Sequence, residues 1–188
     1  MIRSTQFIIA AAVLAVASAA VAANFDVGPA VGARIPALHV TDAAGKPQTV
    51  KALAGKKGVV LMFFRSAKWC PYCQAQLIAM KAAPEALAAR GYTLAAISYD
   101  DPQILTEFAA KREINYPLLS DKGSITIDAW AMRDPQYKPD SIAFGVPMPG
   151  IFIIARDGVV RAKLAEQGYK TRPPLGAVLA SIDALSAK

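Results

Sequence analysis

Cys70 and Cys73 are the only cysteines in this chain of 188 residues, and they form one Cys-x-x-Cys motif. This spacing suits thiol–disulfide exchange, in which a thiolate attacks a disulfide and a neighbouring thiol resolves the mixed disulfide. An inert structural bridge is the alternative, but a bridge that encloses only two residues constrains little chain. A metal site would need two further ligands, and the chain has a single histidine, His39. We therefore expect a redox-active pair, with neither a metal nor another cofactor.

The motif is predicted to lie where a buried strand passes into a helix. Residues 59–64 are apolar without interruption, which is typical of a central strand covered on both faces. Pro71 suits the first turn of a helix, so Cys70 would lie at the helix N-terminus, where free N–H groups and the helix dipole favour a thiolate. Lys68 adds positive charge nearby. Cys70 is thus expected to be exposed and readily ionised, and Cys73, one helical turn further in, to be more buried.

The remaining hydrophobic pattern predicts strands and helices in an α/β order. Further strands are expected at 35–40, 48–50, 92–99, 116–119, 150–155 and 159–164, and helices at 71–90, 101–112, 121–132 and 173–185. Pro84 should kink the first of these helices, because proline cannot donate the helical hydrogen bond. Residues 133–144 are expected to be irregular. This order predicts an α/β domain in which helices flank a central mixed β-sheet, with an N-terminal β extension.

The N-terminal segment is typical of a secretory signal peptide. Arg3 precedes an uncharged apolar stretch over residues 7–23, which ends in small residues that fit a small-x-small cleavage site. We therefore expect a signal peptide at 1–23, a single mature domain at 24–188 and a periplasmic location. An uncleaved N-terminal anchor is the alternative.

The composition is that of a folded, mildly basic protein. Hydrophobic residues make up 54% and charged residues 19%, which supports a sizeable core and argues against disorder. The net charge of +7 is scattered along the chain rather than gathered in one run. We therefore expect no nucleic-acid partner.

Four segments carry a resemblance to a known family: 63–73 (FFRSAKWCPYC), 96–100 (AISYD), 116–121 (YPLLSD) and 149–158 (PGIFIIARDG). They resemble the thioredoxin-like redoxin family, which joins AhpC/TSA peroxiredoxin-like domains to exported TlpA/ResA-type thiol–disulfide oxidoreductases. The resemblance implies a thioredoxin-like fold, with Cys70 as the nucleophile and Cys73 as the resolving thiol. It also implies that Pro149 is a cis-proline beside the disulfide, that the backbone of Met148 can pair with a bound peptide, and that Trp69 packs beside the site.

The resemblance leaves two activities open, thiol–disulfide exchange and peroxide reduction. In the peroxiredoxin branch a threonine, a proline and an arginine accompany the reactive cysteine, and the matching positions here hold Cys70, Ser66 and Pro149. These departures favour exchange with protein disulfides or dithiols. Arg65 could stand in for the missing arginine and keep a peroxidase as the alternative function, unless it faces solvent at the strand end.

The residues around the cysteines also bear on redox potential and electron supply. Pro71-Tyr72 resembles the glutaredoxin dipeptide, and a helix-stabilised thiolate implies a reduction potential above that of thioredoxin. The carboxylate that assists the resolving thiol in thioredoxin is missing from residues 59–64, so Asp100 or Glu166 would have to serve. Because the chain has no NADPH or flavin motif, a membrane or periplasmic thiol donor is the expected partner. The candidate site therefore consists of Cys70 and Cys73 with Arg65, Lys68, Trp69, Pro71, Tyr72, Met148 and Pro149 around them.

Overall fold

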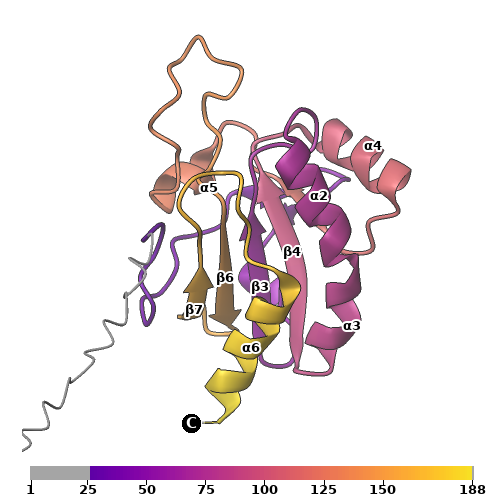
Figure 1. Cartoon of the computed structure of the whole chain (residues 1–188), viewed down its shortest axis with the longest axis vertical. Helices are drawn as coiled ribbons and strands as arrows, with labels where there is room; N and C mark the ends of the chain where they lie inside the picture. The colour runs from indigo at the N-terminus through magenta and orange to yellow at the C-terminus, as the bar shows by residue number, and fades with distance from the viewer. Residues whose placement is uncertain (1–25, 188) are drawn as a thin grey trace, which may run out of the picture.

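The computed structural model describes residues 26–187, in which a seven-stranded mixed β-sheet forms the centre of the molecule (Figure 1). The strands are β1 (Val40–Thr41), β2 (Pro47–Gln48), β3 (Gly58–Phe63), β4 (Tyr92–Ser98), β5 (Leu118–Ser120), β6 (Gly150–Ala155) and β7 (Val160–Leu164). Their order across the sheet is β2-β1-β5-β4-β3-β6-β7. β3 pairs in parallel with β4 and antiparallel with β6, so it lies in the interior of the sheet.

Helices cover both faces of this sheet. They are α1 (Val50–Leu53), α2 (Pro71–Ala79), the 3-10 turn η1 (Met80–Ala82), α3 (Ala83–Ala88), α4 (Pro102–Arg112), α5 (Ile125–Ala129) and α6 (Leu175–Ser186). Side chains of α2, α3, α4 and α6 pack with Val60 and Met62 of β3 on one face. The other face, with Val59 and Leu61, packs against α5 and the N-terminal segment. The predicted α/β fold and its fully covered central strand are therefore confirmed.

Two helices and a 3-10 turn replace the single helix predicted for residues 71–90. α2 ends at Ala79, and α3 begins at Ala83 with Pro84 in its first turn. Proline lacks the N–H that would continue the helical hydrogen bonds, so the run is interrupted as Pro84 predicted. The interruption is a full break at Met80–Ala82 rather than a kink at Pro84 itself. The cysteines consequently lie on α2, a helix of nine residues.

The helix predicted at 121–132 is shorter in the structure, where α5 begins only at Ile125. The buried carboxylate of Asp121 accepts hydrogen bonds from the backbone N–H groups of Thr126 and Ile127 at 3.0 and 2.8 Å. Ser124 has a left-handed conformation with φ of 60°. Asp121 therefore caps the N–H groups of the first turn of α5 from a position before the helix, and the helix begins at Ile125 instead of residue 121.

The N-terminal β extension is also shorter than predicted. The strand expected at 35–40 is reduced to β1 and to an isolated bridge between Arg34 and Val159, while β1 and β2 form a hairpin at the edge of the sheet. α1, which was not predicted, begins where Thr49 Oγ1 accepts the N–H of Ala52. Within residues 26–187 we find no helix with the length and apolar character needed to cross a membrane. The predicted signal peptide at 1–23 lies outside the described residues.

Candidate active site

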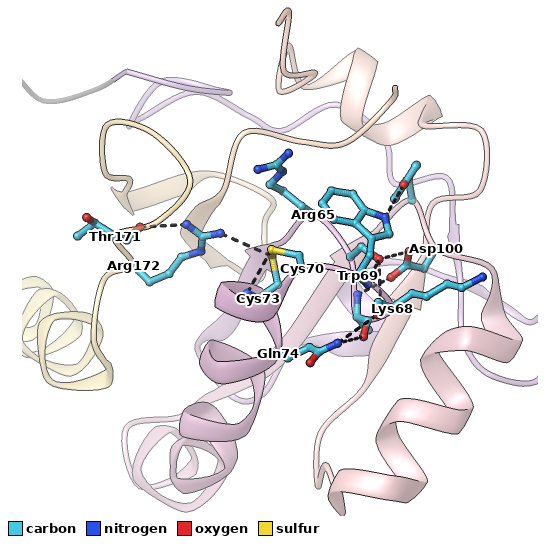
Figure 2. The surroundings of a disulfide bond; sticks show 12 residues. Arg65, Lys68, Trp69, Cys70, Cys73, Gln74, Asp100, Thr171 and Arg172 are labelled. Atoms are coloured by element: carbon cyan, nitrogen blue, oxygen red, sulfur yellow. Dashed lines mark hydrogen bonds between the residues drawn. A yellow bond between two sulfur atoms is a disulfide. The ribbon is translucent and has the colours of Figure 1, made fainter. Parts of the chain in front are cut away.

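A disulfide joins Cys70 and Cys73 at the N-terminus of α2, shortly after the carboxyl end of β3 (Figure 2). Cys70 is the N-cap residue, and its Sγ accepts a hydrogen bond from the backbone N–H of Cys73 at 3.3 Å. Pro71 lies in the first turn of α2. The two Cα atoms are 5.3 Å apart, within the usual range for a bridge. The helix N-terminus therefore brings both sulfurs together, and its free N–H groups favour a thiolate there.

The disulfide is covered rather than exposed. Cys70 is 2% exposed and Cys73 is 0% exposed, so the prediction of an exposed Cys70 is wrong. The cover includes residues 165–174, termed the C-terminal strap, which join β7 to α6. Tyr169 of the strap packs edge-to-face on Tyr72 between the cysteines, with 5.9 Å between the ring centroids. The strap therefore forms part of the surroundings that bury the two sulfurs.

The cation in contact with the disulfide is Arg172 of the strap. Its Nη2 donates to Cys73 Sγ at 3.6 Å, and its Nη1 donates to the carbonyl of Thr171 at 3.0 Å. Burial, followed by the charge of Arg65, lowers the pKa of Arg172 to about 10, so the guanidinium remains protonated near neutral pH. Lys68 was predicted to supply the positive charge, but its side chain is exposed and points away from the sulfurs (Figure 2).

Sequence reasoning missed Arg172 for a simple reason. It lies 99 residues beyond Cys73 and belongs to no motif. The two residues meet only because the strap crosses the N-terminus of α2. No local pattern in the sequence could have identified this contact.

Arg65 is buried beneath aromatic rings and does not face solvent. The residue is 3% exposed, and its guanidinium carbon lies 4.3 Å from the ring centroid of Tyr169, 4.9 Å from that of Tyr137 and 5.1 Å from that of Trp69. It also donates a hydrogen bond to the Tyr137 hydroxyl. Cation–π attraction thus links the loop before the cysteines to the strap and to the irregular segment that carries Tyr137. Within the described chain the arginine bonded to a sulfur is Arg172.

The loop between β3 and the cysteines is held by Asp100, just beyond the end of β4. Its carboxylate accepts hydrogen bonds from Ser66 Oγ at 2.8 Å and from the N–H of Ala67 at 2.7 Å. Burial raises the pKa of Asp100, and these hydrogen bonds partly oppose that rise. Figure 2 shows Asp100 on the side of Trp69 away from the disulfide, and Glu166 is exposed. Neither carboxylate therefore takes the place of the missing acid beside the resolving thiol.

Replacing Asp100 by alanine is expected to lower the free energy of unfolding by about 1–3 kcal/mol, because the buried N–H of Ala67 loses its acceptor. Urea denaturation of the Asp100→Ala variant measures this loss. Asp101→Ala is the matched control, since the neighbouring carboxylate is half-exposed and pairs at the surface with Lys122, an interaction of small energy. Equal losses in the two variants would contradict the role of Asp100 in the loop.

The residues before β6 do not form the arrangement implied by the resemblance. The described residues contain no cis peptide bond, so the prediction that Pro149 is cis is wrong. The N–H of Met148 donates to the carbonyl of Met132 at 2.7 Å, which holds the chain extended into β6 with the intrinsically favoured trans bond. Met148 packs against the core cluster on the sheet face opposite the cysteines. Its N–H is therefore already occupied and does not offer a donor to a bound peptide.

Trp69 lies beside the site and connects it to the same irregular segment. Its Nε1 donates to the hydroxyl of Tyr99 at 3.0 Å, and that hydroxyl donates to the carbonyl of Ile142 at 2.6 Å. The indole ring also stacks on Arg65. Trp69 therefore connects the loop before the cysteines to two neighbouring segments.

The mixed sheet with its flanking helices and the Cys-x-x-Cys pair at the N-terminus of α2 define a protein of the thioredoxin-like redoxin class. Within residues 26–187, no group of three or more His, Cys, Asp or Glu side chains is placed to hold a metal ion. Among solved structures the chain is similar to peroxidoxin BcpB from Mycobacterium tuberculosis, with a TM-score of 0.68 over 84% of this chain and 96% of that chain. The two sequences are 20% identical, so this similarity shows the fold alone.

The AhpC/TSA family pattern matches residues 31–163, and the chain belongs to this family. It is 25% identical over 130 residues to the chloroplastic peroxiredoxin Q of Sedum lineare, a match that covers 69% of this chain and 66% of the relative. It is 32% identical over 91 residues to the putative peroxiredoxin bcp of Haemophilus influenzae, which covers 48% of this chain and 57% of the relative. The chain thus spans less than two thirds of the length of these curated relatives.

Proposed function

We propose that the protein is a thiol–disulfide oxidoreductase whose Cys70–Cys73 pair exchanges with protein disulfides and dithiols. The observation that carries this proposal is the disulfide between these cysteines at the N-terminus of α2. In the reduced chain the Cys70 thiolate attacks one sulfur of a substrate disulfide, and the first substrate thiolate leaves. Cys73 then attacks Cys70, so the internal disulfide forms and the second substrate thiolate leaves. Two electrons pass to the substrate, and the reverse sequence oxidises a dithiol.

Peroxide reduction is a second candidate function with support of similar strength. Arg172 donates to Cys73 Sγ, which favours ionisation of that thiol, and the similar curated proteins are named peroxiredoxins. In this reaction the Cys73 thiolate attacks the O–O bond of a hydroperoxide, which gives a sulfenic acid and, after protonation, water or an alcohol. The Cys70 thiol condenses with the sulfenic acid, releases water and leaves the same disulfide. An external dithiol then restores both thiols.

Rapid mixing of the reduced full-length protein distinguishes the two functions. Hydrogen peroxide and insulin, a protein with accessible disulfides, serve as separate oxidants, and the fluorescence of Trp69 reports oxidation of the adjacent pair. We expect a fast second-order reaction with insulin and a slow one with peroxide. The opposite order would make the protein a peroxidase, and no fast reaction with either oxidant would overturn both functions.

We also propose that the protein is exported and receives electrons from a thiol donor in the membrane or periplasm. The proposal rests on the single arginine and apolar stretch of residues 1–23 and on the lack of an NADPH or flavin motif. Expression of the full chain in a bacterium with a periplasm, followed by fractionation and mass measurement, tests it. The expected product is periplasmic and begins near residue 24. An uncleaved chain in the cytoplasm would overturn the export proposal.

A further inference from the structure

Each sulfur of the disulfide has its own hydrogen-bond donor (Figure 2). Cys70 Sγ accepts the backbone N–H of Cys73 at 3.3 Å, which is a contribution of the helix N-terminus. Cys73 Sγ accepts from Nη2 of Arg172 at 3.6 Å, which is a contribution of the strap. The two thiols therefore differ in what stabilises their ionised forms.

The proposed exchange requires Cys73 to be ionised when it attacks the mixed disulfide at Cys70. It is fully buried, and burial raises the pKa of a thiol, whereas only the thiolate attacks a disulfide. Within the described residues no carboxylate is hydrogen-bonded to either sulfur, so no acidic side chain is placed to take the proton of Cys73. The charged and titratable groups near Cys73 are Cys70 and Tyr72 on α2, Arg172 on the strap and, at longer range, Arg65 after β3. Tyr169 of the strap packs on the ring of Tyr72.

We propose that Arg172 is a catalytic residue that holds Cys73 as a thiolate in the reduced chain and thereby drives release of the bound substrate. The proposal rests on the dithiol exchange proposed above. In thioredoxin a carboxylate assists the resolving thiol by accepting its proton. Here the positive charge of the Arg172 guanidinium keeps the resolving thiol ionised instead. An opposite charge beside a thiol lowers its pKa, so the attacking form of Cys73 is present without a base.

The surroundings of Arg172 support this role. Among the described residues it forms no ion pair with a carboxylate, so its charge is not neutralised there. Its Nε is buried without a hydrogen-bond partner, and Nη1 is fixed by the carbonyl of Thr171. The strap thus orients the guanidinium so that Nη2 points at Cys73 Sγ.

The release step balances without a further reactant. The substrate is first held through a disulfide between its own sulfur and Cys70. The Cys73 thiolate attacks Cys70 Sγ, the Cys70–Cys73 bond forms, and the bond to the substrate sulfur breaks. The electron pair of that bond leaves with the substrate as a thiolate, which takes a proton from water. Arg172 stays protonated throughout and transfers neither a proton nor an electron.

The test separates capture by Cys70 from release by Cys73. The reduced full-length protein is mixed with a fluorescent peptide dimer joined by a disulfide, and mixed disulfide and free peptide are followed by acid quenching and mass spectrometry. Arg172→Met is expected to leave capture within about twofold of wild type and to slow release at pH 7 by about threefold for each unit by which the pKa of Cys73 rises. The thiolate fraction falls about tenfold per unit, but a more basic thiolate attacks about threefold faster. The difference in release rate between Arg172→Met and wild type should become smaller as pH rises, because Cys73 then ionises without the arginine. Arg172→Lys, which keeps a positive charge, should restore part of the release rate.

Lys170→Met is the matched control, because Lys170 is an exposed cation of the same strap whose Nζ lies 6.0 Å from the Tyr169 ring. Its release rate should match wild type. Release that is unchanged in Arg172→Met, or slowed equally at every pH, would overturn the proposal. If Arg172→Met does not fold, Arg172→Gln, which keeps a donor without the charge, gives the same comparison. Failure of the wild-type protein to capture the peptide would instead overturn the proposed exchange itself.

Discussion

Replacing Cys70 by serine is expected to abolish capture of a disulfide substrate, whereas replacing Cys73 by serine is expected to preserve capture and trap the mixed disulfide. The reason is that the helix N-terminus activates Cys70 for attack, while Cys73 is needed only for release. Insulin reduction by either variant should fall by orders of magnitude, as is typical when a covalent nucleophile is removed. Turnover assays and mass spectrometry of the trapped adduct measure both effects.

The same variants give the reverse order if the protein reduces peroxides. With Cys73 as the attacking thiol, Cys73→Ser loses the fast reaction with hydrogen peroxide, while Cys70→Ser still forms a sulfenic acid. A thiol-specific sulfenic acid probe detects that product. If Cys70→Ser consumes peroxide rapidly and Cys73→Ser captures no disulfide, the function is therefore peroxide reduction and not disulfide exchange.

Replacing Trp130 by alanine is expected to lower the free energy of unfolding by about 3–5 kcal/mol. Trp130 is 1% exposed, and its ring packs on Phe63 of β3 and Phe152 of β6, with centroid distances of 5.0 and 5.4 Å. Its removal leaves a cavity between α5 and the sheet. Because small proteins are stable by about 5–15 kcal/mol in total, this is a large share. Urea denaturation measures the loss.

The control for Trp130 lies on the neighbouring helix α5. Ile125 is 55% exposed, so Ile125→Ala should change stability by no more than about 0.5 kcal/mol. Trp130 belongs to the core cluster on the sheet face opposite the cysteines, so the folded Trp130→Ala variant should still capture a disulfide substrate. A variant as stable as the Ile125 control would contradict the role of this aromatic cluster in the core.

Local sequence was sufficient to predict the elements that carry the cysteines. The uninterrupted apolar run at 59–64 predicted a strand buried on both faces, and β3 is such a strand. Pro71 predicted the start of a helix directly after Cys70, and Pro84 predicted an interruption of the helical run, which the structure shows as α2, η1 and α3. These predictions succeeded because each depends on neighbours along the chain: a proline ring restricts its own turn, and a covered strand must be apolar at every position.

Predictions that depended on distant segments failed. Lys68, two residues before Cys70, was expected to supply the positive charge, yet Arg172 supplies it from the strap. Cys70 was expected to be exposed, yet the site lies under cover that includes Tyr169. The cis bond expected at Pro149 is absent from the described chain, where the N–H of the preceding residue is bonded across to Met132.

The chemistry of the site therefore followed from residue type and spacing, while its electrostatics and accessibility followed from packing. Two thiols with two residues between them on a helix N-terminus suit disulfide exchange in any fold that supplies that helix. Which charge lies beside which sulfur depends on how the strap crosses α2, since Arg172 and Cys73 are 99 residues apart. Contacts of this kind arise only when the whole chain buries its apolar faces, so no short stretch of sequence encodes them.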